Sequence, residues 1–229
     1  MIVRQSRELS SEYSIMKEIR CTAESMSATT TDSILLAEYI QPRRGERLLE
    51  IGCGEGDVSL LISCKHDVEI LAIDISGEAV RKAREKAAHF HTNIPGHVTF
   101  EFKALEEIDL PESRNKYDVV FCNPPFYSRG RGRVSPVNDR ARARQEISLS
   151  LTDIFAVSGR LLKPEGRLCL IHTAERLDEI ILLGNAHGLP VRELRPVYTA
   201  PGKPAKRVLV TASKTTSRGV KILDPVLLY

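Results

Sequence analysis

One asparagine followed by two prolines is the stretch of this sequence whose residue types point most directly to chemistry. Asn123, Pro124 and Pro125 come shortly after residues 118–120, an Asp-Val-Val run typical of a short buried strand. Because neither proline can donate a backbone hydrogen bond, the strand ends there and the asparagine lies at its carboxyl end. The Asn123 side-chain oxygen and the Pro124 carbonyl can then accept the two hydrogens of an exocyclic NH2 group on a planar molecule.

Two aromatic residues, Phe126 and Tyr127, follow the prolines. The Phe126 ring can stack on a planar substrate, and Pro125 and Tyr127 are expected on the same substrate side. Hydrogen bonds to Asn123 and Pro124 would draw the amine nitrogen toward a tetrahedral geometry and expose its lone pair. We therefore expect Asn123, Pro124 and Phe126 to be catalytic, with proton loss after the attack because the motif has no histidine or carboxylate. A plain Asn-Pro turn beside a buried phenylalanine is the structural alternative.

A second candidate site lies in a glycine-rich turn. The apolar run at residues 47–51 has the length of a strand and is followed by Gly52, Gly54 and Gly56, after which a helix is expected. Missing β-carbons let the backbone of such a turn pass close to a nucleotide-like ligand. Asp74 ends the next expected strand, at the separation from the glycines that suits an acid holding two ribose hydroxyls.

An acid before the glycine turn indicates which cofactor this is. Glu50 stands two residues before Gly52, and the turn lacks the Gly-x-Gly-x-x-Gly spacing of dinucleotide sites. A carboxylate attracts the cationic amino acid end of S-adenosylmethionine, whereas it would repel a pyrophosphate. The pattern therefore favours S-adenosylmethionine over a nicotinamide dinucleotide.

The elements that must position these residues alternate along the chain. Strands are expected at 47–51, 69–74, 97–102, 118–120 and 167–172, with helices between them, and two further β-rich runs at 191–198 and 207–212 form a hairpin. Alternating strands and helices predict a parallel sheet with right-handed crossovers, to which the hairpin adds antiparallel strands. Ligands of such sheets bind outside the carboxyl ends of the strands. We expect an N-terminal extension at residues 1–28 and a single domain at 29–229.

Basic residues gather directly after the Asn-Pro-Pro stretch. Lys206 in the hairpin loop extends the same basic character. Such a loop beside an amine pocket suits the phosphate backbone of a nucleic acid, although a solvated loop would have the same composition. The arginines concerned are Arg129, Arg131, Arg133, Arg140, Arg142 and Arg144.

Composition narrows the remaining possibilities. The net charge is only +3, so a nucleic-acid partner must be argued from where the charges lie. No apolar run approaches the roughly 20 residues that span a bilayer, and no signal peptide is recognised, so we expect a cytoplasmic protein. The five cysteines form no Cys-x-x-Cys pair and the histidines lack metal-ligand spacing, so neither disulfides nor a metal is expected. We interpret His172 as a capping or partly buried histidine.

Together these motifs resemble a known family. The glycine turn, Asp74 and the Asn-Pro-Pro-Phe stretch resemble the Rossmann-like, seven-stranded S-adenosylmethionine-dependent methyltransferases that modify amino groups. The Ala-Arg-Gln-Glu run at 143–146 and residues 204–210 resemble, more narrowly, the bacterial tRNA-valine adenine-37 N6-methyltransferase family. The resemblance implies that fold, S-adenosylmethionine as cofactor, and methylation of adenine N6 in tRNA. It also implies that Ala104 and Leu105 contact the cofactor adenine, through apolar groups or backbone amides.

One departure from the family pattern leaves the substrate open. The family more often has Tyr-Phe after the prolines, whereas Phe126 comes first here, as is common in ribosomal-RNA guanine N2 enzymes. Guanine N2 methylation in ribosomal RNA is therefore an alternative, and methylation of a protein glutamine at N5 is a more distant one. A non-catalytic cofactor- or RNA-binding module is the alternative from another class, but folding alone would not require Asn123 and Asp74.

Overall fold

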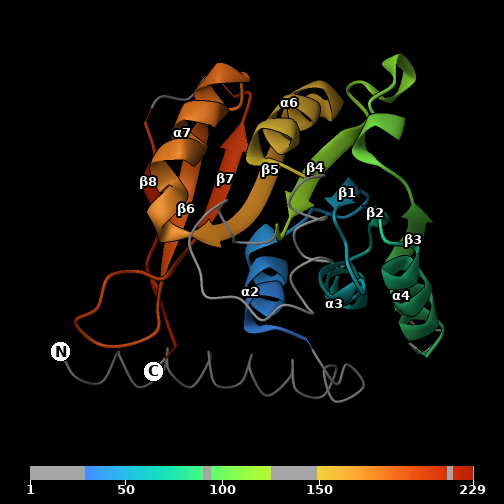
Figure 1. Cartoon of the computed structure of the whole chain (residues 1–229), viewed down its shortest axis with the longest axis horizontal. Coiled ribbons are helices and arrows are strands. Elements are labelled where there is room, and N and C mark those ends of the chain that lie inside the picture. The colour runs from blue at the N-terminus through green and yellow to red at the C-terminus, as the bar shows by residue number, and fades with distance from the viewer. Residues whose placement is uncertain (1–28, 90–93, 125–148, 216–218, 229) are drawn as a thin grey trace, which may run out of the picture.

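The structure is built around a central β-sheet (Figure 1). The computed structural model describes residues 29–89, 94–124, 149–215 and 219–228. The predicted N-terminal extension and the arginine-rich loop lie outside these ranges. Within them the sheet has nine strands in the order β3-β2-β1-β4-β5-β7-β6-β8, and β9 also pairs with β6. The strands are β1 (Arg47–Ile51), β2 (Glu69–Asp74), β3 (His97–Phe102), β4 (Tyr117–Cys122), β5 (Leu162–Thr173), β6 (Val191–Tyr198), β7 (Arg207–Ser213), β8 (Lys221–Ile222) and β9 (Val226–Leu227).

Parallel pairing joins the first five strands, so their carboxyl ends meet at one edge of the sheet. β7 then lies antiparallel between β5 and β6, as the expected hairpin requires. The predicted plan of a parallel sheet with an antiparallel C-terminal hairpin is thus confirmed. β5 is longer than expected because residues 162–166 pair irregularly at the start of β4. β8 and β9 have two residues each and were not predicted.

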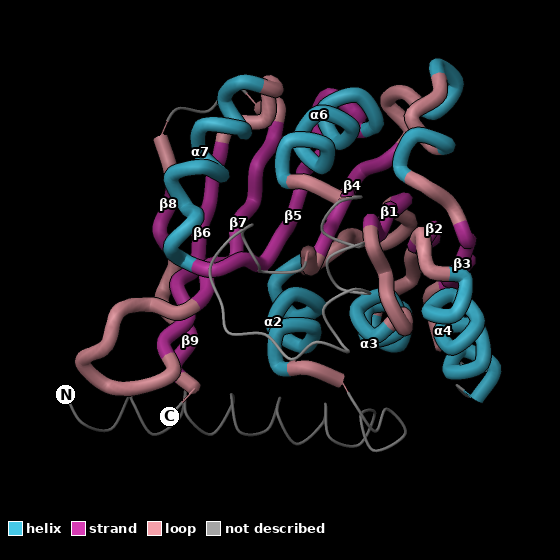
Figure 2. Tube along the Cα trace, viewed as in Figure 1, coloured by secondary structure: helices cyan, strands magenta, loops and turns pink. Residues whose placement is uncertain are grey.

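Helices cover both faces of the sheet (Figure 2). One face is covered by α2 (Thr31–Ile40), α3 (Asp57–Lys65) and α4 (Gly77–His89), and the other by α6 (Leu151–Leu161) and α7 (Leu177–Ala186). The alternation of side chains along β4 supplies both cores, since Phe121 packs into the first and Val120 into the second. No helix in the described ranges is long and apolar enough to cross a membrane.

The helix that precedes the sheet is held at both ends. The Thr30 side chain accepts a hydrogen bond from the Ser33 backbone N–H, which satisfies one of the orphan donors of the first turn of α2. At the other end, Gln41 adopts a left-handed conformation and Pro42 follows, so the helix stops. Short 3-10 turns at Leu105–Glu107, Pro111–Ser113 and Ala174–Arg176 complete the connections.

Candidate active site

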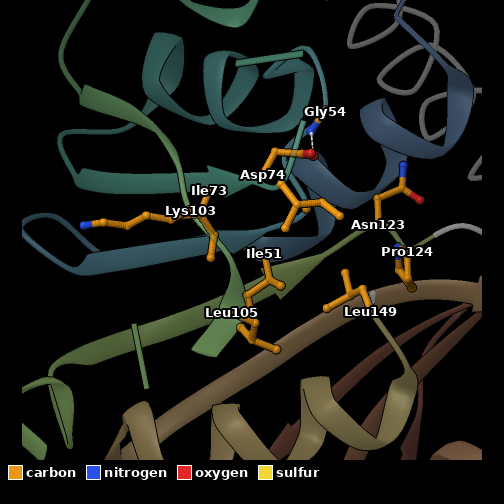
Figure 3. Close-up of a pocket in the computed structure, with 11 residues that line it drawn as sticks. Ile51, Gly54, Ile73, Asp74, Lys103, Leu105, Asn123, Pro124 and Leu149 are labelled. Carbon is orange, nitrogen blue, oxygen red and sulfur yellow. Dashed lines mark hydrogen bonds between the residues drawn. The ribbon is translucent and has the colours of Figure 1, made fainter. Parts of the chain in front are cut away.

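A cavity of about 240 Å³ opens at the carboxyl ends of β1, β2 and β4 (Figure 3). This is the edge at which open α/β sheets bind their ligands. Both predicted sites contribute to the same cavity, because strands β1 and β4 are neighbours in the sheet. The lining consists of Ile51, Gly52, Gly54, Ile73, Asp74, Ile75, Lys103, Leu105, Asn123, Pro124 and Leu149.

The glycine turn is fastened to the neighbouring strand through its backbone. The N–H groups of Gly52 and Cys53 both donate to the Ile73 carbonyl, each at 2.9 Å. Gly52 and Gly54 have φ values of 71° and 53°, a left-handed conformation that glycine adopts without strain. A β-carbon at Gly54 would meet no atom within 4 Å. The glycine is therefore required there by its backbone conformation, and the space beside it is open to a ligand.

Asp74 is the anchored acid of the site. Its carboxylate is buried, and it accepts hydrogen bonds from the Gly54 N–H on Oδ2 and the Ser76 N–H on Oδ1, both at 2.8 Å. These two bonds fix the plane of the carboxylate while each oxygen keeps acceptor capacity. A rigid acceptor pair at the end of β2 fits the two ribose hydroxyls of a nucleoside.

Glu50 lies beneath the glycine turn rather than in the cavity lining. Its carboxyl is 1% exposed and accepts a hydrogen bond from the Ser59 hydroxyl at the start of α3. Burial raises the pKa of Glu50 to about 8, although the Ser59 hydrogen bond acts in the opposite direction. The group is therefore mostly protonated near neutral pH. Its interaction with the cationic end of a cofactor stays a prediction.

Asn123 follows β4 and is held from α2. Its Nδ2 donates to the Ser33 hydroxyl at 3.4 Å, and that hydroxyl also bonds Thr30 Oγ1 at 2.9 Å. The Asn123 nitrogen is therefore directed toward α2, and no hydrogen bond joins its side-chain oxygen to another described residue. Figure 3 shows the side chain beside Pro124. Pro124 lines the cavity next to it. Both residues of the predicted amine site thus line the cavity, and the acceptor roles of the Asn123 side-chain oxygen and the Pro124 carbonyl stay predictions.

Three predicted cofactor residues are not part of the cavity lining. Glu50 is one of them, and Gly56 is another: a β-carbon there would lie 2.6 Å from the Phe100 ring, so this glycine permits close packing of α3 against β3. The third is Ala104, whose backbone N–H donates to a Glu107 carboxylate oxygen at 2.6 Å. Each of these positions has a structural role of its own.

Several residues predicted to be catalytic or to bind the substrate lie outside the described ranges. They are Pro125, Phe126, Tyr127, Arg129, Arg131, Arg133, Arg140, Arg142 and Arg144. Lys206 lies within the described ranges. It is exposed and directly precedes β7. Because Arg207 pairs with Thr173 at the end of β5, Lys206 lies at the same edge of the sheet as the cavity. Its role in substrate binding stays a prediction.

Sequence reasoning missed five lining residues. Ile75 had the clearest signal, because it directly follows Asp74 and is a large apolar residue left 39% exposed at a strand end. Lys103 directly precedes Ala104 and Leu105 in the loop after β3, so its position also pointed to the site. The other three missed residues are Ile51, Ile73 and Leu149.

Other reactive side chains lie elsewhere. His172 is buried and does not line the cavity, and burial lowers its pKa to about 4, so it is neutral near pH 7. The described cysteines are free: Cys53, Cys64, Cys122 and Cys169. In the described part of the chain, no group of three or more histidine, cysteine, aspartate or glutamate residues is arranged to hold a metal ion.

Comparisons with known proteins agree with this geometry. A family model described as a methyltransferase domain matches residues 42–188. A tRNA1(Val) (adenine(37)-N6)-methyltransferase of Parabacteroides distasonis is 32% identical over 81% of this chain and 76% of its own length. The enzyme of the same name from Aeromonas hydrophila is 31% identical over 79% of this chain and 74% of its own length.

Solved structures show the same fold. A predicted O-methyltransferase of Agrobacterium tumefaciens superposes with a TM-score of 0.63 at 19% identity, covering 86% of this chain and 87% of that one. A geranyl diphosphate C-methyltransferase of Streptomyces coelicolor, solved with S-adenosyl-L-homocysteine, has a TM-score of 0.57 at 13% identity, covering 80% and 79%.

The sheet, the glycine turn and the anchored acid define an S-adenosylmethionine-dependent methyltransferase. The cavity fits this cofactor, because Asp74 presents a fixed pair of acceptors beside apolar side chains and an open turn of backbone. Within that class, the chain belongs to the family of the tRNA1(Val) (adenine(37)-N6)-methyltransferases.

Proposed function

We propose that this protein methylates the exocyclic N6 amine of an adenine in tRNA. The observation that carries the proposal is the placement of Asn123 and Pro124 together at the cavity, with the Asn123 nitrogen held by Ser33. The names of the relatives support adenine as the base and tRNA as the substrate. A tRNA substrate also suits the predicted cytoplasmic location.

The cofactor half of the site is assigned to the glycine turn and to Asp74. Asp74 would accept the ribose hydroxyls, since its carboxylate is already fixed by two backbone N–H groups. Ile75 and Leu105 would flank the adenine with apolar surface. When bound, S-adenosylmethionine supplies an electrophilic methyl group. The open backbone at Gly54 leaves room for the rest of the molecule.

The substrate half acts on the amine. The nitrogen lone pair of an aromatic amine is delocalised into the ring, so it is a poor nucleophile. Hydrogen bonds from its two N–H groups to the Asn123 side-chain oxygen and the Pro124 carbonyl favour the tetrahedral geometry of the transition state, in which the lone pair is free. Because Ser33 holds the amide nitrogen of Asn123, the oxygen is presented without a reorientation cost.

No general base is assigned to the reaction. Asp74 is the one carboxylate that lines the cavity among the described residues, and its two oxygens already accept backbone N–H groups. Proton loss from the amine therefore follows methyl transfer. Lys206 would contact a phosphate of the RNA at the same edge, as would the arginines after the motif.

The direct test is transfer of a labelled methyl group to an unmodified tRNA1(Val) transcript, with the nucleosides resolved by mass spectrometry. We expect N6-methyladenosine, and no label in a matched transcript with guanine at position 37. Asn123→Ala is expected to lower turnover by about 10²–10³-fold, in line with the loss of one preorganised transition-state contact, and to leave cofactor affinity nearly unchanged. N2-methylguanosine in ribosomal RNA tested alongside, with no label in tRNA, would contradict the proposal.

A further inference from the structure

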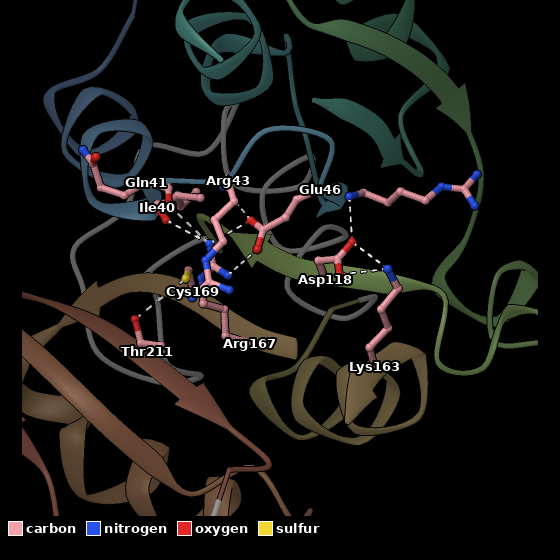
Figure 4. A network of polar contacts seen from close by, with 10 residues as sticks. Ile40, Gln41, Arg43, Glu46, Asp118, Lys163, Arg167, Cys169 and Thr211 are labelled. Carbon is pink, nitrogen blue, oxygen red and sulfur yellow. Dashed lines mark hydrogen bonds and ion pairs between the residues drawn. The ribbon is translucent and has the colours of Figure 1, made fainter. Parts of the chain in front are cut away.

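A second and larger cavity, of about 880 Å³, lies away from the methyl-transfer site. It is formed where the carboxyl end of α2 meets β6, β7 and residue 167 of β5. Figure 4 draws three of its lining residues, Arg43, Arg167 and Thr211, within a network of polar contacts. Its size is within the usual range for small-ligand sites. The cationic residues in its lining are Arg43, Arg167, Arg192, Arg195 and Lys221.

The two carboxylates in the lining are already neutralised. Glu38 forms an ion pair with Lys65 at 2.5 Å, and Glu193 forms one with Lys221 at 3.7 Å. Neither carboxylate is therefore free to balance a further cation. The cavity keeps an excess of positive charge.

Three of the arginines have no carboxylate partner among the described residues. Arg167 is paired with Glu46 at 3.0 Å, as Figure 4 shows. Arg43, Arg192 and Arg195 form no ion pair in the described ranges. Three arginine residues thus line one cavity with no carboxylate among the described residues to balance them, which gives the cavity a positive potential that attracts anions.

A β-bulge in β6 places two of these arginines, Arg192 and Arg195, on the same side of the strand. Val191 pairs with Ala212 and Glu193 with Thr211, so two residues of β6 face one residue of β7 and the strand contains a β-bulge at Arg192. A bulge interrupts the alternation of side chains, and Arg192 consequently lines the same cavity as Arg195.

The hydrogen-bond donors of these two side chains are not all used. The Nε atoms of Arg192 and Arg195 are buried and have no acceptor among the described residues. Arg192 donates one Nη to the Thr215 carbonyl at 2.6 Å. The Arg195 guanidinium lies over the Tyr39 ring, 6.0 Å from its centroid, which holds its plane in place.

We propose that this cavity binds a phosphate group through Arg43, Arg192 and Arg195. A guanidinium presents its N–H groups in a planar fork that matches phosphate oxygens, and a phosphate in the cavity would supply the charge that these three residues lack. The group is either a phosphodiester of RNA or a free phosphate monoester. The inference does not rest on the proposed methylation, because it concerns a different cavity.

The test is calorimetric titration of the full chain with inorganic phosphate, at an ionic strength kept constant with sodium chloride. We expect one saturable site in the wild type. Arg195→Gln and Arg43→Gln should each weaken binding by about tenfold or more, as loss of one charged contact predicts. Because Arg43 is exposed, its replacement is expected to leave the fold intact even if Arg195→Gln perturbs it. Saturating S-adenosylhomocysteine should leave the phosphate affinity unchanged.

Arg81→Gln is the matched control, because it removes the same charge from an exposed position on α4. Equal weakening by Arg81→Gln, or the absence of saturable binding in the wild type, would overturn the proposal. A second titration with single-stranded oligouridylate of about 20 nucleotides separates the two sources of phosphate. Weakening of both ligands by Arg43→Gln and Arg195→Gln identifies RNA, whereas weakening of phosphate alone identifies a free phosphate.

Discussion

The buried carboxyl of Glu50 makes the stability of the protein depend on pH in a direction opposite to that of most acids. Burial raises its folded-state pKa from 4.5 to about 8. A group with a raised folded pKa contributes stability that is complete below the unfolded value and is lost as pH rises through the folded value. The contribution of Glu50 to the free energy of unfolding should therefore fall as the pH rises from its unfolded pKa of 4.5 to its folded pKa of about 8.

The magnitude follows from the separation of the two pKa values. Each pH unit well below the folded pKa corresponds to about 1.4 kcal/mol, and the slope falls to half of that at the folded pKa itself, so between about pH 6 and about pH 8 the free energy of unfolding should fall by about 2 kcal/mol on account of this group. Glu50→Gln keeps the size of the side chain and an oxygen that can accept the Ser59 hydrogen bond, but it cannot titrate. The variant should therefore lack this fall, whatever its absolute stability.

Urea unfolding of both proteins at several values between about pH 6 and about pH 9 measures the difference in slope. Other titrating groups are common to the two proteins and cancel in the comparison. Ser59→Ala provides a further control: it removes a hydrogen bond that lowers the Glu50 pKa, so the loss of stability should continue to higher pH. Parallel pH profiles for wild type and Glu50→Gln would refute the reasoning.

The same titration offers a way to examine cofactor binding. If the cationic end of S-adenosylmethionine interacts with Glu50 as the sequence predicts, binding lowers the pKa of that carboxyl and releases a proton. Calorimetry near neutral pH in two buffers of different ionisation enthalpy should detect the proton, and Glu50→Gln should abolish it. Cofactor binding without proton release would show that the Glu50 carboxyl does not interact with the cationic end of the cofactor.

Three further substitutions test individual contacts. Gly56→Ala should lower the free energy of unfolding by about 2 kcal/mol or more, because φ is 83° at this position and the new β-carbon would collide with the Phe100 ring. A free energy of unfolding, measured in urea, that lies within about 0.5 kcal/mol of the wild-type value would contradict this. Ile75→Ala should weaken S-adenosylmethionine binding about fivefold in calorimetry, through lost apolar contact, with little change in melting temperature. Ser33→Ala should lower kcat about two- to tenfold by releasing Asn123, while a changed cofactor Kd would argue against a positioning role.

The order of strands and helices could be predicted from the sequence because each element has a local pattern of apolar residues. Strand-length apolar runs alternate with helical periodicity from residue 47 onward, and right-handed crossovers leave few topologies open. Asp74 and Asn123 could be placed in one site because both end parallel strands. β8 and β9 could not be predicted, since two residues carry no periodic signal.

The sequence could not predict how deeply each site residue is buried, nor which residues distant in the chain pack against it. Gly54 and Gly56 look alike in the motif, yet one opens onto the cavity and the other makes room for Phe100. Nothing in the spacing of Glu50 shows that it is buried beneath the turn. Arg192 joins the second cavity only through a bulge, a feature that depends on the register of β7 and leaves no local pattern in the sequence.

The position of β7 has a consequence for how the chain is made. β7 separates β5 from β6, so the ladder from β5 to β6 closes only after residues 207–213 have been synthesised. Until then the long β5 strand, with Leu168 and Leu170 along it, remains an open edge on a nascent chain. A ribosome that stalls shortly before this point would hold an aggregation-prone intermediate, which chaperones are suited to shield.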